Sequence, residues 1–370
     1  MFRNVNSLWE SYDTTDSKYK LMLICTPDTQ KRVEAIQKHL ITVLWEDVPV
    51  MLIPFKQFEN TAWKVSLEKS VREKNVYIYS DVESNYREWN IAADTNSRYM
   101  NSKFIINASK NAGAKTINVI YPIYPYERSD KPEKSGKSLS HKKPPFGAAM
   151  VARDLMRAWV DYLFTLDIHN TAILSHFWSD ESPTKYLHID HNWVIEEAIM
   201  DSWLKDFELW STDLWGTDKI QLTAEDYNAN HWVALKARDL TTVNKIKQLL
   251  IYNWFATLTG KDLLLYDDLI DTAGTAETAI DILQTHNPRS ITVVFTHWLF
   301  NGKALERLQR LYDEWKIKVV YITDSVYREW LPEFIKVIPT DKIMAHNIVL
   351  RAKEKPLEYN RHDPEDYKNN

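Results

Sequence analysis

Short apolar runs alternate along the chain with longer segments of helical periodicity. The apolar runs predict buried strands at residues 20–25, 48–55, 75–80, 116–121 and 162–166. Amphipathic spacing predicts helices over residues 28–45, 96–112 and 146–160. Residues 62–68 alternate between apolar and polar side chains, which predicts a half-exposed strand. The order of these elements predicts an α/β fold with an open, mostly parallel sheet, in which ligand sites lie at the carboxyl ends of strands.

The length of 370 residues favours two domains, either of which is large enough for its own hydrophobic core. Residues 1–18 form a polar lead-in. We place an N-terminal α/β domain at 19–170, a second α/β domain at 171–338, and a C-terminal helix and tail at 339–370. We expect that helix to pack back on the first domain.

The stretch from Asp262 to Leu283 carries the most specific chemical pattern. Leu263 to Tyr266 is an unbroken apolar run, and two adjacent acids follow it. The turn at 271–275 then opens a helix, and the unpaired N–H groups at such a start bind phosphate. Adjacent acids suit ribose hydroxyls or a magnesium ion. The stretch therefore predicts a pocket for a 5-phosphorylated ribose, and an ordinary strand–turn–helix unit with a capping Asp or Thr is the alternative.

Two further predicted strands end in polar residues. Arg128 and Asp130 follow the strand at 116–121, where a planar guanidinium can clamp phosphate. A solvated loop is the alternative there. Asp167 and His169 lie two residues apart at the next strand end, so they point the same way, as metal or phosphate contacts should. A hydrogen-bonded packing histidine is the alternative.

Composition narrows the class of protein. Acidic residues outnumber basic ones by 51 to 46, for a net charge of −5, which argues against a general nucleic-acid partner. The single cysteine, Cys25, has no intramolecular disulfide partner, so a reducing compartment fits best. The chain has no apolar run of membrane-spanning length and no signal peptide at its start. We therefore expect a cytoplasmic protein with no membrane partner. Seven glycines is few for such a chain, and 15 tryptophans is many.

The strand-end segments occur in a recognisable order. Tyr-Pro-Tyr-Glu-Arg-Ser-Asp stands at 124–130, Leu-Asp-Ile-His at 166–169 and Tyr-Asp-Asp-Leu-Ile-Asp-Thr-Ala-Gly-Thr at 266–275. This order resembles the ribose-phosphate pyrophosphokinases (PRPP synthetases), which typically read Pro-Tyr-x-Arg-x-Asp, Asp-Leu-His and Val-Asp-Asp-x-Ile-Asp-Thr-Gly-Gly-Thr. Thr-His-Trp-Leu-Phe-Asn-Gly at 296–302 resembles the Thr-His-x-x-Phe-x-Gly that follows in that family. Phosphoribosyltransferases share only the 266–275 loop.

The resemblance implies two phosphoribosyltransferase-like domains and a magnesium-dependent transfer of the β,γ-diphosphoryl group of ATP to the 1-hydroxyl of ribose 5-phosphate, with release of AMP. It implies ATP contacts at Arg128 and Asp130, and a catalytic and magnesium-binding role for His169. The residues that it implies for ribose-phosphate binding are Asp267, Asp268, Asp271, Thr272, Ala273, Gly274 and Thr275. The family's catalytic Lys-x-Arg pair is matched by Lys236 and Arg238, for which a helix surface with two cations is an equal alternative.

The family's adenine segment, Phe-x-Asp-x-Glu, is altered here. An ungapped match assigns ATP contacts to Phe58 and Asn60 and loses both acids, and a gapped match on Phe55, Gln57 and Glu59 keeps one acid. Both matches are open.

Two more segments depart from the family. The magnesium segment Ser-Pro-Asp-x-Gly-Gly is reduced to residues 223–228, where Asp226 is the nearest acid. The Trp-rich segment 176–219 is longer than the family needs. Its tryptophans suit a packed core or, alternatively, stacking on a second base in a larger acceptor.

These departures resemble a divergent, phage-type branch of the family, of which one group makes ADP-ribose pyrophosphate from ADP-ribose during NAD⁺ reconstitution. The expected partners are therefore ATP and either ribose 5-phosphate or ADP-ribose, and homo-oligomers are usual in the family. If the chain is phage-encoded, its compartment is the host cytoplasm. Two alternatives stay open, namely a phosphoribosyltransferase and a catalytically silent regulatory subunit with the same fold.

Overall fold

The computed structural model describes residues 19–60, 62–83, 94–129, 146–177, 184–204, 206–212, 215–238, 246–251, 258–326 and 330–353. Within these ranges, only the backbone is described at 215–218, 233–238 and 246–251.

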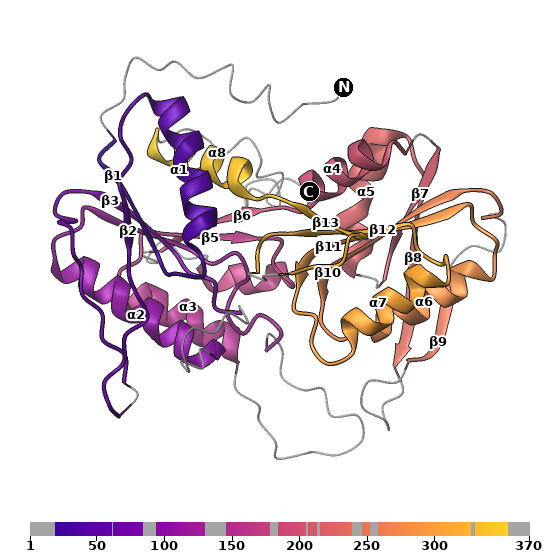
Figure 1. Ribbon diagram of the computed structural model, residues 1–370, viewed down its shortest axis with the longest axis horizontal. Helices are drawn as coiled ribbons and strands as arrows, with labels where there is room; N and C mark the ends of the chain where they lie inside the picture. Colours follow the sequence, from indigo (N-terminus) through magenta and orange to yellow (C-terminus); the bar gives the residue numbers. More distant parts are fainter. Residues whose placement is uncertain are drawn as a thin grey trace.

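The first half of the chain forms a six-stranded, fully parallel sheet in the order β2-β1-β3-β4-β5-β6. Its strands are β1 (Leu21–Cys25), β2 (Val50–Leu52), β3 (Asn75–Tyr79), β4 (Thr116–Ile120), β5 (Tyr162–Leu166) and β6 (Lys185–Ile189). The helices of this half are α1 (Gln30–Leu44), α2 (Thr95–Asn111), α3 (Gly147–Arg157) and the 3-10 helix η3 (Thr171–Phe177). Figure 1 shows α1 on one face of the sheet and α2 with α3 on the other.

Alternation along β1 explains the two layers. Leu21, Leu23 and Cys25 belong to the core on the α1 side, whereas Met22 and Ile24 belong to the core with α2 and α3. Successive side chains of a strand point to opposite faces, so a run that is apolar at every position suits a sheet covered on both sides.

The second half forms a seven-stranded sheet in the order β13-β12-β11-β10-β7-β8-β9. Its strands are β7 (Phe207–Ser211), β8 (His231–Arg238), β9 (Ile246–Ile251), β10 (Asp262–Ile270), β11 (Ser290–Trp298), β12 (Val319–Thr323) and β13 (Ile335–Ile338). All neighbours are parallel except β8 and β9. The helices are α4 (Asn192–Ser202), α5 (Trp215–Tyr227), α6 (Gly274–Gln284), α7 (Ala304–Asp313) and α8 (Asp341–Ala352). The predicted fold class, two mostly parallel sheets flanked by helices, is confirmed.

The C-terminal helix ties the two halves together. α8 leaves the edge strand of the second sheet and packs against α1 of the first half (Figure 1). His39 Nε2 on α1 lies 3.0 Å from Asp341 Oδ2 on α8. One continuous apolar core runs from β1 and α1 through α8 to α4, α5 and β10. The two sheets therefore share a hydrophobic layer on this side.

Three sequence-based boundaries differ from the structure. Residues 62–68 are not a strand and contribute only an isolated bridge between Trp63 and Gln57. Their alternation reflects local burial instead, since Trp63 packs on Phe55. Val65 and Leu67 pack against the core that lies between the first sheet and helices α2 and α3. The strand predicted at 48–55 is limited to Val50–Leu52. The first sheet also includes β6, so the chain passes between the halves after Ile189 rather than near residue 170.

Four tryptophans stand just past helix ends in the left-handed backbone region. Trp45, Trp159, Trp203 and Trp315 have φ of 55°, 57°, 55° and 58°. Their side chains are strongly exposed, from 62% at Trp159 to 91% at Trp315. Helices commonly end with glycine in this conformation because glycine has no Cβ to clash. Tryptophan at positions that ordinarily take glycine explains part of the low glycine count of 7 and part of the high tryptophan count of 15.

Replacing Trp203 by glycine should stabilise the protein. Trp203 caps α4 with φ 55° and is 82% exposed, so its ring makes few contacts that the change would remove. A left-handed non-glycine residue costs roughly 1 kcal/mol, which Trp203→Gly should recover and Trp203→Ala should not. Urea unfolding followed by circular dichroism measures both. Equal stability of the two variants would show that the cap backbone carries no strain.

Candidate active site

Polar side chains from both sheets meet where the strands end. His169, three residues past β5, places its Nδ1 2.9 Å from Oδ2 of Asp268 near the end of β10. Arg128, which follows β4, donates from Nη1 to Oδ2 of Asp271 at 2.6 Å. The carboxyl ends of parallel strands share one edge, so residues distant in sequence converge there. Arg128 and His169, which are predicted to contact ATP, thus face Asp268 and Asp271, which are predicted to bind the ribose phosphate.

A lysine that sequence reasoning missed lies beneath these contacts. Lys219 on α5 donates from Nζ to Oδ1 of Asp167 at 2.6 Å and to Oδ2 of Asp268 at 3.3 Å. Burial alone would raise the pKa of Asp268, but Lys219 and His169 outweigh it and lower the pKa to about 2. Nothing in the sequence marks Lys219 among 46 basic residues, since only the packing of α5 brings it here.

Asp167 is the buried support of the site. Its carboxylate is fully covered and its backbone has φ 31°. Besides Lys219, it accepts a hydrogen bond from the hydroxyl of Tyr266 and lies 3.6 Å from Nδ1 of His191. These contacts hold the tip of β5 in a bent conformation. Asp167 and His169 therefore do different work, because Asp167 is enclosed while the His169 side chain is 39% exposed.

Glu127 is a second buried acid at the same place. One oxygen, Oε2, accepts the backbone N–H of His169 at 3.2 Å, and Oε1 is buried with no hydrogen-bond partner among the described residues. Burial and the nearby Asp268 raise the pKa of Glu127 to about 8. The carboxyl therefore lacks a cation strong enough to keep it charged in the free protein.

The turn after β10 has the strand–turn–helix geometry expected of the predicted phosphate site. Ala273 has φ 61° and immediately precedes α6, and the N–H groups at a helix start are suited to bind an anion. Asn301 holds the turn through Nδ2 to Asp271 Oδ1 at 2.8 Å. Arg307 donates to the Thr272 carbonyl at 2.8 Å, and a Cβ on Gly274 would lie 2.9 Å from its Nη1. The guanidinium thus approaches the turn because residue 274 is glycine.

Comparison with known proteins identifies the arrangement. The N-terminal domain of ribose phosphate pyrophosphokinase matches residues 21–151. Ribose-phosphate pyrophosphokinase 2 of Saccharomyces cerevisiae is 28% identical over 267 residues, which are 70% of this chain and 75% of the yeast protein. The enzyme of Oceanobacillus iheyensis is 29% identical over 270 residues, 73% of this chain and 76% of its own. The chain is therefore similar to the ribose-phosphate pyrophosphokinases over about 70% of its length.

A solved structure agrees at the level of fold. The crystal structure of phosphoribosylpyrophosphate synthetase from Mycobacterium smegmatis superposes with a TM-score of 0.72 and 22% identity, covering 90% of this chain and 99% of that one. Both halves of the pyrophosphokinase fold are therefore present.

The structure brings together most of the residues expected in a pyrophosphokinase site. Arg128, His169, Asp268 and Asp271 are in direct contact with one another in pairs, and Asp267 precedes Asp268 on β10. Residues 272–275 form the turn and first residues of α6. Asp130 lies outside the described residues.

Phe58 and Asn60 lie elsewhere. They belong to the segment between β2 and β3, which projects from the first sheet away from the second (Figure 1). Phe58 N donates to the Ala62 carbonyl at 2.9 Å and the Phe58 ring is 55% exposed. The structure does not join these two residues to the strand-end cluster of their own chain.

Lys236 and Arg238 lie on β8, so the alternative of a helix surface is wrong. Ser211, the last residue of β7, pairs with Val233, and β8 continues five residues further in the same direction. The backbone therefore carries the pair past the edge of the sheet at which Asp267 and Asp268 lie. Their side chains are outside the described part of the chain.

Asp226 is not brought to the cluster. It is exposed near the far end of α5, seven residues after Lys219, which is about 10 Å along a helix. Residues 211–216, which run from the end of β7 to the start of α5, read Ser-Thr-Asp-Leu-Trp-Gly and keep the Ser, the Asp and the second Gly of the family's Ser-Pro-Asp-x-Gly-Gly. Asp213 itself lies outside the described residues.

Cation binding here would need few protein ligands. Among the described residues, no group of three or more His, Cys, Asp or Glu side chains could hold a metal ion. Magnesium usually keeps several waters and binds one or two protein groups plus substrate phosphates. The exposed His169 ring fits that mode of binding as a direct ligand, and the Glu127 oxygen that has no partner among the described residues fits it as an acceptor for one of the metal's waters.

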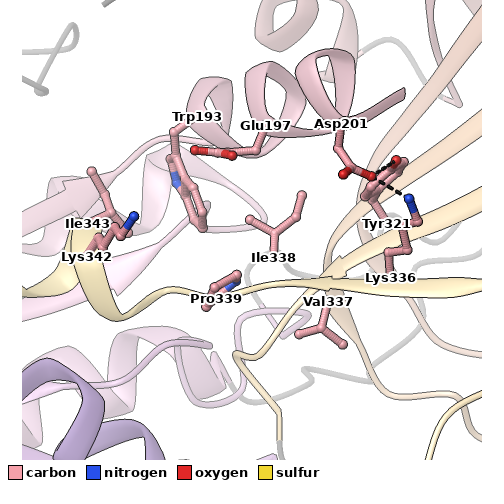
Figure 2. A pocket seen from close by; sticks show the side chains of 10 residues that line it. All are labelled: Trp193, Glu197, Asp201, Tyr321, Lys336, Val337, Ile338, Pro339, Lys342 and Ile343. Atoms are coloured by element: carbon pink, nitrogen blue, oxygen red, sulfur yellow. Dashed lines mark hydrogen bonds and ion pairs between the residues drawn. The ribbon is translucent and has the colours of Figure 1, made fainter. Parts of the chain in front are cut away.

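A separate cavity of about 230 Å³ lies between α4 and the segment that joins β13 to α8 (Figure 2). Trp193, Glu197 and Asp201 enter it from successive turns of α4, and Asp201 pairs with Lys336 at 2.6 Å. Apart from Trp193, which belongs to the Trp-rich segment, none of the residues predicted to bind substrates lines this cavity. The described helices include none long and apolar enough to cross a membrane.

His169 should be protonated at neutral pH in the free protein. Its hydrogen bond to Asp268 raises the pKa from 6.5 to about 9. The stabilisation that this pair gives to the fold is therefore complete below pH 6.5 and is lost as pH rises through 9. NMR titration of the His169 ring, assigned with a His169→Gln sample, should give the raised pKa, and Asp268→Asn should lower it by more than a unit. A ring that titrates near 6.5 in both proteins would contradict the ion pair.

Proposed function

We propose that the protein transfers the β,γ-diphosphoryl group of ATP to the anomeric 1-hydroxyl of a 5-phosphorylated ribose, with ribose 5-phosphate giving PRPP and AMP. The single observation that carries this proposal is the contact between His169 and Asp268. It joins the end of β5, where the family binds the nucleotide, to the end of β10, where it binds ribose. A phosphoribosyltransferase needs only the second of these parts.

The acceptor side is assigned to the end of β10 and the start of α6. The carboxylates of Asp267 and Asp268 accept the vicinal ribose hydroxyls. The N–H groups that open α6 bind the 5-phosphate, with Thr272 and Thr275 as added donors. Arg307, in contact with this turn, adds positive charge behind the phosphate.

The donor side is assigned to Arg128, Asp130 and His169, and Phe58 and Asn60 stay predictions for the adenine. Because those two lie on a segment that projects away from their own cluster, they would contact ATP from a neighbouring copy, in keeping with the expected homo-oligomer. His169 and Glu127 fit magnesium, and the acid that we expect to assist them is Asp213 rather than Asp226. Magnesium, when bound, neutralises charge on the transferring phosphates.

Substrates must replace contacts that the free protein makes with itself. Asp268 is held by His169 and Lys219, and Asp271 by Arg128. Ribose hydroxyls and phosphate oxygens supply new partners for Asp268, His169, Asp271 and Arg128, while Lys219 keeps its contacts with the buried acids. The 1-hydroxyl oxygen then attacks the β-phosphorus, the bond to the bridging oxygen of AMP breaks, and the hydroxyl proton passes to solvent. The residues act by positioning and by charge, because phosphoryl transfer needs little covalent help.

The purified protein should form AMP from ATP only when magnesium and an acceptor are both present. Ribose 5-phosphate and ADP-ribose are to be tested side by side by nucleotide chromatography, since ADP-ribose as acceptor is a sequence-based prediction. Asp268→Ala removes a ribose contact and should lower kcat/KM by about 30- to 1,000-fold. Asp262→Asn, at the other end of β10 in a surface pair with Arg289, is the matched control and should stay active. Absence of AMP with both acceptors would favour a silent subunit.

Lys236 and Arg238 are proposed as the cations that close over the transferring phosphates. Charge that acts mainly in the transition state should make Lys236→Ala and Arg238→Ala lower kcat by about 10²- to 10⁴-fold while ATP affinity changes little. Lys261→Ala, which removes a lysine in a surface pair with Asp206, is the control. Steady-state kinetics and calorimetry separate the two effects. Normal turnover in Lys236→Ala would contradict this assignment, and the lysines of residues 131–143 would be the next candidates for the cations that close over the phosphates.

A further inference from the structure

Glu127 has a buried carboxyl oxygen for which the described part of the chain offers no partner. The residue lies between β4 and α3 and is only 3% exposed. Oε2 accepts the backbone N–H of His169 at 3.2 Å, whereas Oε1 makes no hydrogen bond with any residue that the structure describes. Buried polar atoms are nearly always paired, and a carboxyl oxygen left alone is costly. The orphan atom therefore needs an explanation.

Support of the β5 tip explains only half of this side chain. Holding the His169 N–H takes a single acceptor, which a glutamine or an asparagine would supply without a charge. The surroundings explain the rest. The charged groups that act on Glu127 are Asp268, His169 and Lys219, all members of the strand-end cluster. The free oxygen thus belongs to a side chain that lies among the substrate-binding groups rather than in a remote part of the core.

We propose that Glu127 Oε1 accepts a hydrogen bond from a water ligand of the divalent cation that accompanies the nucleoside triphosphate. This inference rests on the proposed function, which brings a metal–nucleotide complex to His169. Magnesium keeps several of its waters, and the described residues contain no three-ligand metal cluster, so groups outside the first coordination sphere must orient those waters. A buried carboxylate fixed by the backbone of a candidate metal ligand suits that task.

The same carboxylate would then couple the cation to the position of His169. Its two oxygens face different partners, the His169 backbone and the cation's water, so binding of the metal would tighten the tip of β5. Removing an outer group of this kind typically lowers metal affinity by about 10- to 100-fold.

The test compares nucleotide binding with and without metal. Calorimetry measures the Kd of α,β-methylene-ATP in Mn²⁺ and in EDTA, and the ratio of the two is the metal advantage. Glu127→Gln keeps size and an acceptor for the His169 N–H but loses the carboxylate, so the metal advantage should fall by about 10- to 100-fold while the Kd in EDTA is unchanged. Glu127→Ala should lose at least as much. Circular dichroism confirms that each variant is folded.

Glu46→Gln is the matched control. Glu46 also has a buried Oε1 with no hydrogen-bond partner, but it follows the end of α1, at the opposite edge of the first sheet, and should leave the metal advantage unchanged. A full metal advantage in Glu127→Gln with a loss only in Glu127→Ala would show a purely structural strut and overturn the proposal. So would a wild-type protein that binds the nucleotide equally in Mn²⁺ and EDTA. AMP formation by the wild type tests the proposed function separately, because it does not depend on Glu127→Gln.

Discussion

The ammonium group of Lys219 holds the centre of this molecule together. It lies between the carboxylates of Asp167, at the end of one sheet, and Asp268, near the end of the other. A lysine with its charge buried is stable only when acids surround it, and two buried acids are stable only with a cation between them. Removal of any one of the three would leave an uncompensated charge. The mutual dependence fixes how the ends of β5 and β10 face each other, and the site is built on that alignment.

The remaining contacts between the halves extend this alignment outward. Arg32 on α1 donates to the Asp324 carbonyl at 2.6 Å and pairs with Asp81, while α8 packs against α1. The apolar layer that the two halves share stabilises their contact by burying hydrophobic surface, but it does not fix their relative orientation. The charged pairs fix that orientation. His169 with Asp268 and Arg128 with Asp271 are more exposed than Lys219 with Asp167, so the outer contacts are more accessible to a ligand than the inner one.

Non-glycine residues occupy left-handed backbone positions both at helix ends and in the turn before α6. Trp203 and Ala273 both adopt left-handed backbone conformations that glycine would take without strain. At Ala273 the strain lies in the turn that opens α6, where the sequence predicts a phosphate site. The interactions around the turn, from Asn301 to Asp271 and from Arg307 to Thr272, hold that conformation in place of an intrinsic preference.

The sequence by itself determined the fold class and half of the site. Apolar runs such as Leu263–Leu265 specify buried parallel strands, and acids placed directly after a strand specify a polar sheet edge, because both patterns are local. Tertiary structure alone decided the rest. β6 was hidden in a Trp-rich segment, Lys219 was one lysine among many, and Glu127 stood beside Arg128 with nothing to mark it as buried. Each gains its role from a partner far along the chain, and such a pairing has no signature in local spacing.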